Sequence, residues 1–353
     1  MIIYIRKPEG VKNFMELFIP KKVLFEPAAL DYKLGKDLFN FFNDKGIPIG
    51  FTRSHNRVTG ISGDTPQEVF LFAKQTLVVG VKRTKKLESC SPSAHYQLPI
   101  ATSCPARCQY CYLQTTLGNK PYIRIYVNID EILKNAEEYI KRRLPEITVF
   151  ELSSTADPLS VEHFTGSVAK AIAFFGQQPH GRLRVATKFT NVDDLLDIVH
   201  NGHTRFRFSV NHDDIIKVYE HGTNSLEERI IAAKKMVNAD YPIGFIIAPI
   251  FWEENWKEKY RELLSYLAKE FNTYNNLTFE LITHRFTKRA KNVILNRFPN
   301  TKLDMEEENR SFRYGKFGYG KYVYTPEKMK EMKDYFYEEI YSLFPNAIIE
   351  YFI

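Results

Sequence analysis

The sequence predicts an α/β fold: a partial (β/α)6, TIM-like barrel with an N-terminal α/β extension and a C-terminal β-hairpin. After about residue 95, short apolar runs alternate with amphipathic stretches whose apolar residues recur at i, i+3 and i+4. This alternation is typical of repeated β-α units around a parallel sheet. The chain has 353 residues, of which 44% are hydrophobic, so it is long enough to bury a substantial core.

The barrel prediction contains six strands and six helices in alternation, which indicates a barrel that does not close. The expected strands are residues 97–101, 147–152, 182–187, 204–210, 243–250 and 277–282. The expected helices are residues 130–142, 161–175, 192–199, 226–238, 254–271 and 288–296.

Smaller segments flank the barrel, which we place at residues 96–300. Residues 1–95 form an α/β lead-in that packs on the barrel, with a helix near 35–43 and a strand at 76–81. Residues 301–353 contain a hairpin past residue 310, a helix at 326–344 and a closing strand at 347–352.

Cysteine usage and the amino terminus favour a reducing, cytoplasmic setting. The chain has four cysteines, and three of them are too tightly clustered to pair with one another without strain. Charged residues interrupt every apolar run in the first 22 residues, so we expect neither a signal peptide nor a membrane span.

Positive charge gathers near the carboxyl end. The net charge is +7, and residues 284–324 hold ten Lys or Arg against four acidic residues. An excess of this kind in one segment favours a polyanionic partner.

The most informative motif is C-x-x-x-C-x-x-C, formed by Cys104, Cys108 and Cys111 with Tyr110 before the last cysteine. Three thiolates on one loop can hold three irons of a four-iron cluster and leave the fourth iron free for a small molecule. The loop directly follows the first expected barrel strand, where such folds place their chemistry. A structural zinc site is the alternative, but it needs a fourth ligand, from Cys90 or a distant histidine.

This motif resembles that of the radical S-adenosylmethionine (radical SAM) superfamily. Other runs resemble the spore photoproduct lyase family, from about residue 23 to the end of the chain: LPIATSC, CYLQTTLG, KPYIRIYVN, FRFSVN, FELITHRFTK and YGKYVY. The resemblance implies a barrel of the radical SAM type, a [4Fe-4S] cluster and S-adenosyl-L-methionine. It also implies a DNA repair lyase of the spore core that converts 5-thyminyl-5,6-dihydrothymine in double-stranded DNA to two thymines and draws on an unidentified one-electron reductant.

The hydrogen donor departs from the family pattern. The family usually has a donor cysteine at the end of the second barrel strand, where this chain has Ser154, whose O–H bond is too strong for the task. The thiol outside the cluster motif is Cys90, which we take as the candidate donor. The alternative is that Cys90 is a small side chain without a catalytic role.

The resemblance also suggests residues around the cofactor. Tyr110 and Tyr112 match tyrosines that pass the hydrogen back, although packing over the cluster is an alternative role. Lys188, Ser209 and Asn211 match residues that hold the methionyl carboxylate and the ribose, and Ser154 joins them as a candidate cofactor contact. Ala156 stands where relatives commonly have a serine, so one expected contact is missing.

A basic, aromatic segment, RSFRYGKFGYGKYVY at 310–324, is expected to form a DNA-binding hairpin. Its wedge would fill the gap that a flipped-out lesion leaves, and the matching positions are Lys316, Phe317 and Lys321. A solvated edge hairpin is the alternative.

His284, Arg285 and Lys288 stand at the start of an expected helix, where cations are unfavourable unless an anion lies between them. They are therefore candidate phosphate contacts, with a plain surface position as the alternative for each. Two rival functions stay open at this point: a radical enzyme that acts on RNA or a peptide, and a zinc-stabilised nucleic-acid binding module without catalysis.

Overall fold

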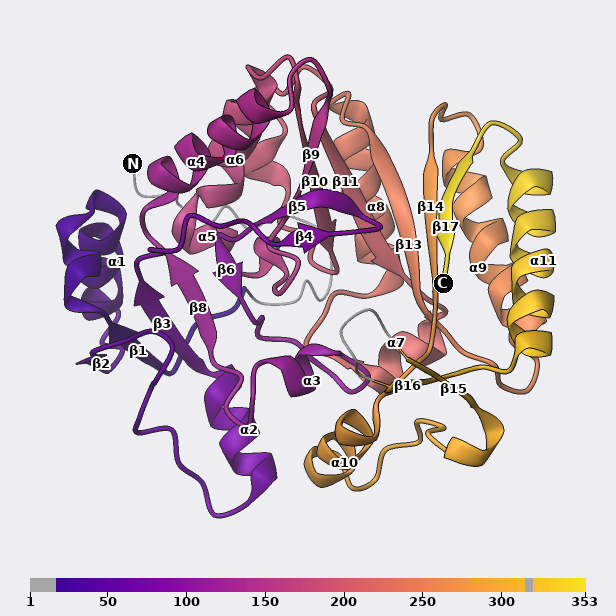
Figure 1. Cartoon of the computed structure of the whole chain (residues 1–353), viewed down its shortest axis with the longest axis horizontal. Helices are drawn as coiled ribbons and strands as arrows, with labels where there is room; N and C mark the ends of the chain where they lie inside the picture. The colour runs from indigo at the N-terminus through magenta and orange to yellow at the C-terminus, as the bar shows by residue number, and fades with distance from the viewer. Residues whose placement is uncertain (1–16, 315–319) are drawn as a thin grey trace, which may run out of the picture.

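A curled, eight-stranded sheet forms the larger part of the computed structural model, which describes residues 17–314 and 320–353 (Figure 1). The strand order is β17-β14-β13-β11-β10-β9-β5-β4, and all neighbours from β5 to β17 are parallel. Within the described residues β4 and β17 do not pair with each other, so the sheet is an open half barrel. The strands are β4 (Ser89–Cys90), β5 (Ala94–Leu98), β9 (Thr148–Leu152), β10 (Gly181–Thr187), β11 (Thr204–Val210), β13 (Ile243–Ile250), β14 (Thr278–Thr283) and β17 (Ile348–Phe352).

Long amphipathic helices cover the outer face of this sheet (Figure 1). In α9, for example, Tyr260, Leu263, Leu264 and Leu267 recur at helical spacing and are buried. The long helices are α4 (Ile129–Arg142), α6 (Ser167–Gly176), α8 (Leu226–Asn238), α9 (Trp256–Phe271) and α11 (Pro326–Leu343). The shorter α3 (Leu113–Thr116), α7 (Asp213–Tyr219) and α10 (Lys288–Arg297) follow the carboxyl ends of strands or the cysteine motif.

A second sheet of five strands, in the order β2-β1-β3-β8-β6, packs beside the half barrel and shares one buried core with it (Figure 1). Strands β6 and β8 come from beyond residue 95, so the two sheets interleave along the chain instead of separating at that point. The elements are β1 (Lys22–Phe25), β2 (Ile49–Phe51), β3 (Thr76–Gly80), β6 (Ala101–Thr102), β8 (Ile123–Tyr126), α1 (Lys33–Asp44) and α2 (Pro66–Lys74).

Three expected elements differ from the structure. The helix expected at 161–175 is broken at Gly166, whose φ of 58° is left-handed, into α5 (Glu162–Thr165) and α6. The segment 192–199 forms only a short 3-10 turn, Asp193–Leu195. The strand expected at 97–101 ends at Leu98, because Pro99 has no N–H to donate, and the chain then crosses to β6 in the other sheet.

The C-terminal hairpin is formed by β15 (Ser311–Tyr314) and β16 (Gly320–Val323). Two backbone hydrogen bonds between Phe286 and Tyr322, of 3.1 and 2.8 Å, attach the hairpin to the segment after β14. Lys316 and Phe317 lie outside the described residues. Among the described helices, none combines the length and apolar character needed to cross a bilayer.

Ser153, the residue after β9, holds in place the segment that leads from β5 out of the half barrel. It is buried, its φ is 52°, and its Oγ accepts hydrogen bonds of 2.9 Å from the backbone N–H groups of Ile100 and Ala101. These bonds set the path into the cysteine motif. The end of β9 therefore positions the loop that follows β5.

We predict that Ser153→Ala lowers the free energy of unfolding by about 2 kcal/mol, because two buried N–H donors lose their acceptor. Urea denaturation measures the change. Ser167→Ala is a matched control, since the Ser167 hydroxyl is buried without a hydrogen-bond partner among the described residues. Equal destabilisation by both substitutions would contradict the assignment.

Candidate active site

The three cysteines of the motif lie on one loop, residues 103–112, at the carboxyl edge of the half barrel. None of the three is in a disulfide within the described residues, and Cys108 is buried. A two-stranded pairing of β7 (Arg107–Cys108) with β12 (Glu220–His221) holds the middle of the loop. At the start of the loop, Lys74 Nζ donates a 2.8 Å hydrogen bond to the carbonyl oxygen of Cys104. The loop is thus fixed at both points by segments distant in the sequence.

The thiols suit a cluster better than a single ion. Within the described residues, no group of three or more His, Cys, Asp or Glu side chains is arranged to hold one metal ion, as tetrahedral zinc would require. Cluster thiolates bind separate irons, so they need not converge on one point. Burial raises the pKa of all three thiols, while the charge of Lys74 or Lys188 opposes it. Bound iron would supply the positive charge that stabilises the thiolates.

Lys188, Ser209 and Tyr110 come together beside the loop. Lys188 Nζ donates to Ser209 Oγ and to Glu220 Oε1, both at 2.9 Å, and lies 5.7 Å from the centroid of the Tyr110 ring. The Tyr110 hydroxyl donates to the same Glu220 oxygen. Two neighbouring strands, β10 and β11, therefore place a cation and a hydroxyl at one point, as the carboxyl ends of parallel strands allow, and the cysteine loop adds the Tyr110 hydroxyl.

Glu220 and Arg229 are neighbours of Lys188 that the sequence interpretation missed. Arg229 Nη2 donates to Glu220 Oε2 at 2.7 Å, and both side chains are fully buried. Burial alone raises the pKa of Glu220, but the charges of Lys188 and Arg229 outweigh it and lower this pKa to about 2. One feature of the sequence could have indicated that Arg229 is buried: it lies on the same apolar helix face as Leu226, Ile230 and Ala233.

Asn211 lies just past the end of β11 and is fully buried. Its Nδ2 donates a 2.8 Å hydrogen bond to the carbonyl oxygen of Pro249, and its Oδ1 accepts one of 3.0 Å from the backbone N–H of His212. Asn211 therefore lies at the same carboxyl edge of the half barrel as Ser209.

A second group brings together Cys90, Ser154 and Tyr112. The Ser154 side chain lies close enough to the Cys90 thiol to lower its pKa, against the larger effect of burial, which raises it. Ser154 Oγ donates to Gln97 Oε1 at 2.6 Å, and the Tyr112 hydroxyl donates to the carbonyl oxygen of Ser154. Cys90 thus lies in space beside the position where the family usually has its donor.

The four described DNA-binding candidates have different environments. His284 is 2% exposed, and burial together with the charge of Arg310 lowers its pKa to about 3. Direct contact of His284 with a phosphate would require it to be uncovered. Lys288 and Lys321 are exposed and Arg285 is half-buried. Burial and the nearby charge of Arg285 lower the pKa of Lys321, so these two cations are neighbours.

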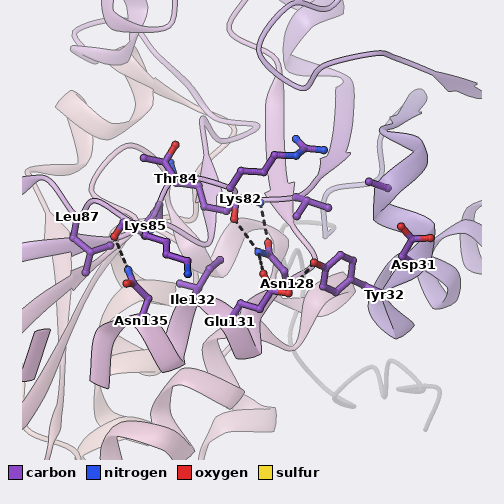
Figure 2. A pocket seen from close by; sticks show the side chains of 14 residues that line it. Asp31, Tyr32, Lys82, Thr84, Lys85, Leu87, Asn128, Glu131, Ile132 and Asn135 are labelled. Atoms are coloured by element: carbon purple, nitrogen blue, oxygen red, sulfur yellow. Dashed lines mark hydrogen bonds between the residues drawn. The ribbon is translucent and has the colours of Figure 1, made fainter. Parts of the chain in front are cut away.

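A cavity of about 410 Å³ lies elsewhere, between α4 and the segment after β3 (Figure 2). Figure 2 shows Tyr32, Asn128 and Glu131 joined by hydrogen bonds along its wall. None of the candidate site residues lines this cavity.

An open parallel half barrel, with three clustered cysteines on a loop at its carboxyl edge, is the arrangement of a radical S-adenosylmethionine enzyme. Residues 18–353 match the family model described as spore photoproduct lyase. The chain belongs to the spore photoproduct lyase family.

Relatives and solved structures match nearly the whole chain. The chain is 49% identical to the spore photoproduct lyase of a Geobacillus species, covering 96% of this chain and 100% of that protein, and 49% identical to that of Bacillus subtilis, covering 95% and 98%. A solved structure of a spore photoproduct lyase double mutant with bound AdoMet and dinucleoside spore photoproduct matches with a TM-score of 0.94 and 50% identity. It covers 96% of this chain and 100% of that one. Another, complexed with dinucleoside spore photoproduct, has the same TM-score, identity and coverage.

We predict that the anaerobically reconstituted protein contains about four irons and about four sulfides per chain. Cys108→Ala should lower the iron content, because one iron loses its ligand. Cys90→Ala is the matched control and should leave it unchanged. Iron, sulfide and zinc analysis measures the outcome. About one zinc per chain without sulfide, or iron loss in Cys90→Ala, would contradict the site.

Proposed function

We propose that this protein repairs spore photoproduct, 5-thyminyl-5,6-dihydrothymine, in double-stranded DNA by direct reversal to two thymines. The observation that carries the proposal is the family match over residues 18–353 together with the three clustered cysteines at the carboxyl edge of the half barrel. When bound, a [4Fe-4S] cluster and S-adenosyl-L-methionine supply a 5′-deoxyadenosyl radical that removes a hydrogen atom from the lesion.

Different residues around the loop would hold the cluster and S-adenosyl-L-methionine. Cys104, Cys108 and Cys111 would each ligate one iron and leave the fourth without a protein ligand. Lys188 would exchange part of its contact with Glu220 for the methionyl carboxylate, with Ser209, Asn211 and Ser154 as the further contacts that we propose for the cofactor. The buried pair of Glu220 and Arg229 keeps the Lys188 side chain pointed at the site through the ion pair between Lys188 and Glu220.

Cys90 is the proposed hydrogen donor. Once the bond between the two thymines breaks, a carbon-centred thymine radical remains. Transfer of a hydrogen atom breaks the S–H bond of Cys90, forms a C–H bond on the thymine and leaves a thiyl radical. The contact between Cys90 and Ser154 supports this role, because it places the thiol beside the usual donor position.

The hydrogen must return to Cys90 before the next turnover. Tyr112 lies against the backbone of Ser154, and Tyr110 lies against Lys188 and Glu220. We therefore assign to these two tyrosines the return of the hydrogen from the cofactor side of the site to the thiol. A regenerated cofactor follows from this assignment, and an external one-electron donor is then needed only to start the reaction.

DNA would bind along the C-terminal hairpin. Phe312 and Tyr314 on β15 are 51% and 81% exposed, and Arg285 lies beside Lys321 of β16. Exposed aromatic rings beside cations can stack on bases and contact phosphates. We assign Arg285 and Lys288 to phosphates and Lys316, Phe317 and Lys321 to the wedge, with His284 supporting the segment that carries the two phosphate contacts. Because the proposed substrate is a lesion of spore DNA, we also propose that the protein acts in the spore core.

Anaerobic incubation of the reconstituted protein with irradiated, lesion-containing DNA tests the function. We expect the lesion to disappear as thymine appears. An unchanged lesion together with continued cofactor cleavage would contradict the proposal and point to RNA or a peptide as substrate.

The donor assignment predicts the result of moving the thiol. Cys90→Ala should leave cofactor cleavage intact, lower repair by about tenfold or more and divert the thymine radical to side products. Cys90→Ala combined with Ser154→Cys should restore repair, because the thiol returns to the neighbouring position. Chromatography of the products measures both effects. Clean repair by Cys90→Ala would show that the hydrogen comes from another group.

Burial, together with the charge of Glu151, raises the pKa of Cys90 to about 11. The donor must be the neutral thiol, so a raised pKa preserves it as pH increases. We predict a constant ratio of repair to side products from about pH 7 to about pH 9.5, a range in which an ordinary thiol with a pKa of about 8.5 would mostly ionise. A decline of that ratio centred near pH 8.5 would contradict a buried donor.

A further inference from the structure

The proposed donor lies on a weakly held element. Strand β4 has only two residues, and it pairs with β5 alone at the edge of the eight-stranded sheet. Its register with β5 is irregular between Ser89 and Cys90. An edge strand this short has few backbone hydrogen bonds with which to fix the position of a side chain.

The turn that follows Cys90 is tied into the lumen of the half barrel through one residue, Ser93. The Ser93 hydroxyl donates to Glu151 Oε2 and accepts a 3.1 Å hydrogen bond from Arg207 Nη1. The Ser93 carbonyl oxygen accepts a 2.8 Å hydrogen bond from Arg184 Nη1. The three partners come from β9, β11 and β10, so three barrel strands hold this turn.

These partners are themselves fixed. Glu151 and Arg207 are 4% and 2% exposed, and Arg207 Nη1 also donates to both carboxylate oxygens of Glu280 at 2.7 and 2.9 Å. Such a buried and mutually paired network has little freedom to move. Ser93 therefore connects a short edge strand to a buried, mutually paired network inside the barrel.

We propose that Ser93 is a positioning residue for hydrogen transfer: through Glu151, Arg207 and Arg184 it holds the β4–β5 turn so that the Cys90 thiol stays beside the substrate radical. The inference rests on the proposed donor role of Cys90. A donor at position 154, at the end of a central barrel strand, would not need this support, whereas a donor at position 90 does. Small errors in the placement of reacting groups can cost up to about a hundredfold in rate.

The test uses the reconstituted holoenzyme, lesion-containing DNA and three variants. Ser93→Ala removes the hydroxyl, Ser93→Thr keeps it, and Ser89→Ala removes an exposed hydroxyl from the same short strand. The measured quantities are cofactor cleavage and the ratio of repaired thymine to side products.

We expect Ser93→Ala to keep cofactor cleavage within about twofold of the parent and to lower the ratio of repair to side products by about tenfold. Ser93→Thr should restore most of that ratio, and Ser89→Ala should leave it unchanged. An unchanged ratio in Ser93→Ala would overturn the inference. So would a parallel loss of cofactor cleavage and repair at constant ratio, because it would make the residue merely structural.

The donor proposal and the positioning proposal fail differently. If Cys90→Ala leaves the product ratio unchanged, the donor assignment fails and the role of Ser93 fails with it. If Cys90→Ala diverts the radical but Ser93→Ala does not, only the positioning role is wrong.

Discussion

The ion-pair network around Arg207 is the constraint on which the rest of the site depends. A sheet that does not close has no hydrogen bonds between its first and last strands. Ion pairs inside the half barrel therefore supply part of the connection between strands. Arg207 of β11 pairs with Glu151 of β9 and Glu280 of β14, and Arg184 of β10 pairs with Glu280 and with Glu350 of β17. Burial alone lowers the pKa of Arg207, but the two carboxylates outweigh it and keep the guanidinium charged. The pairs therefore join strands on both sides of the lumen.

Above this network, the carboxyl edge of the sheet carries two separate groups of side chains. The group of Lys188, Glu220 and Tyr110 lies against the middle of the cysteine loop, and the group of Cys90, Ser154 and Tyr112 lies on the side of the first strands. The first group could hold a carboxylate, and the second could supply a hydrogen atom. Because Cys90 contacts Ser154, the chain carries its thiol on a different element while keeping it in nearly the same place.

Much of the barrel could be predicted, because β11, β13 and α8 have strong periodic patterns and clear ends. The broken helix at Gly166 could not, since its residues keep a helical pattern and only the backbone turn interrupts it. The cysteine motif was visible because its residues are close in sequence. Glu220 could not be predicted as a site residue, because its partners Lys188, Arg229 and Tyr110 come from other segments and only folding brings them together. The same reason hid Ser93, which has no motif of its own.

The central claim is that a lumen-anchored Cys90 delivers its thiol hydrogen to the thymine radical. Thiol hydrogens exchange with solvent, whereas hydrogens on carbon do not, so the origin of the transferred atom can be measured by mass spectrometry of thymine repaired in deuterated buffer. The account predicts one deuterium on the released thymine carbon in the first turnover of the parent protein, and its loss in Cys90→Ala. Thymine without deuterium from the parent, or deuterium retained in Cys90→Ala, would contradict it.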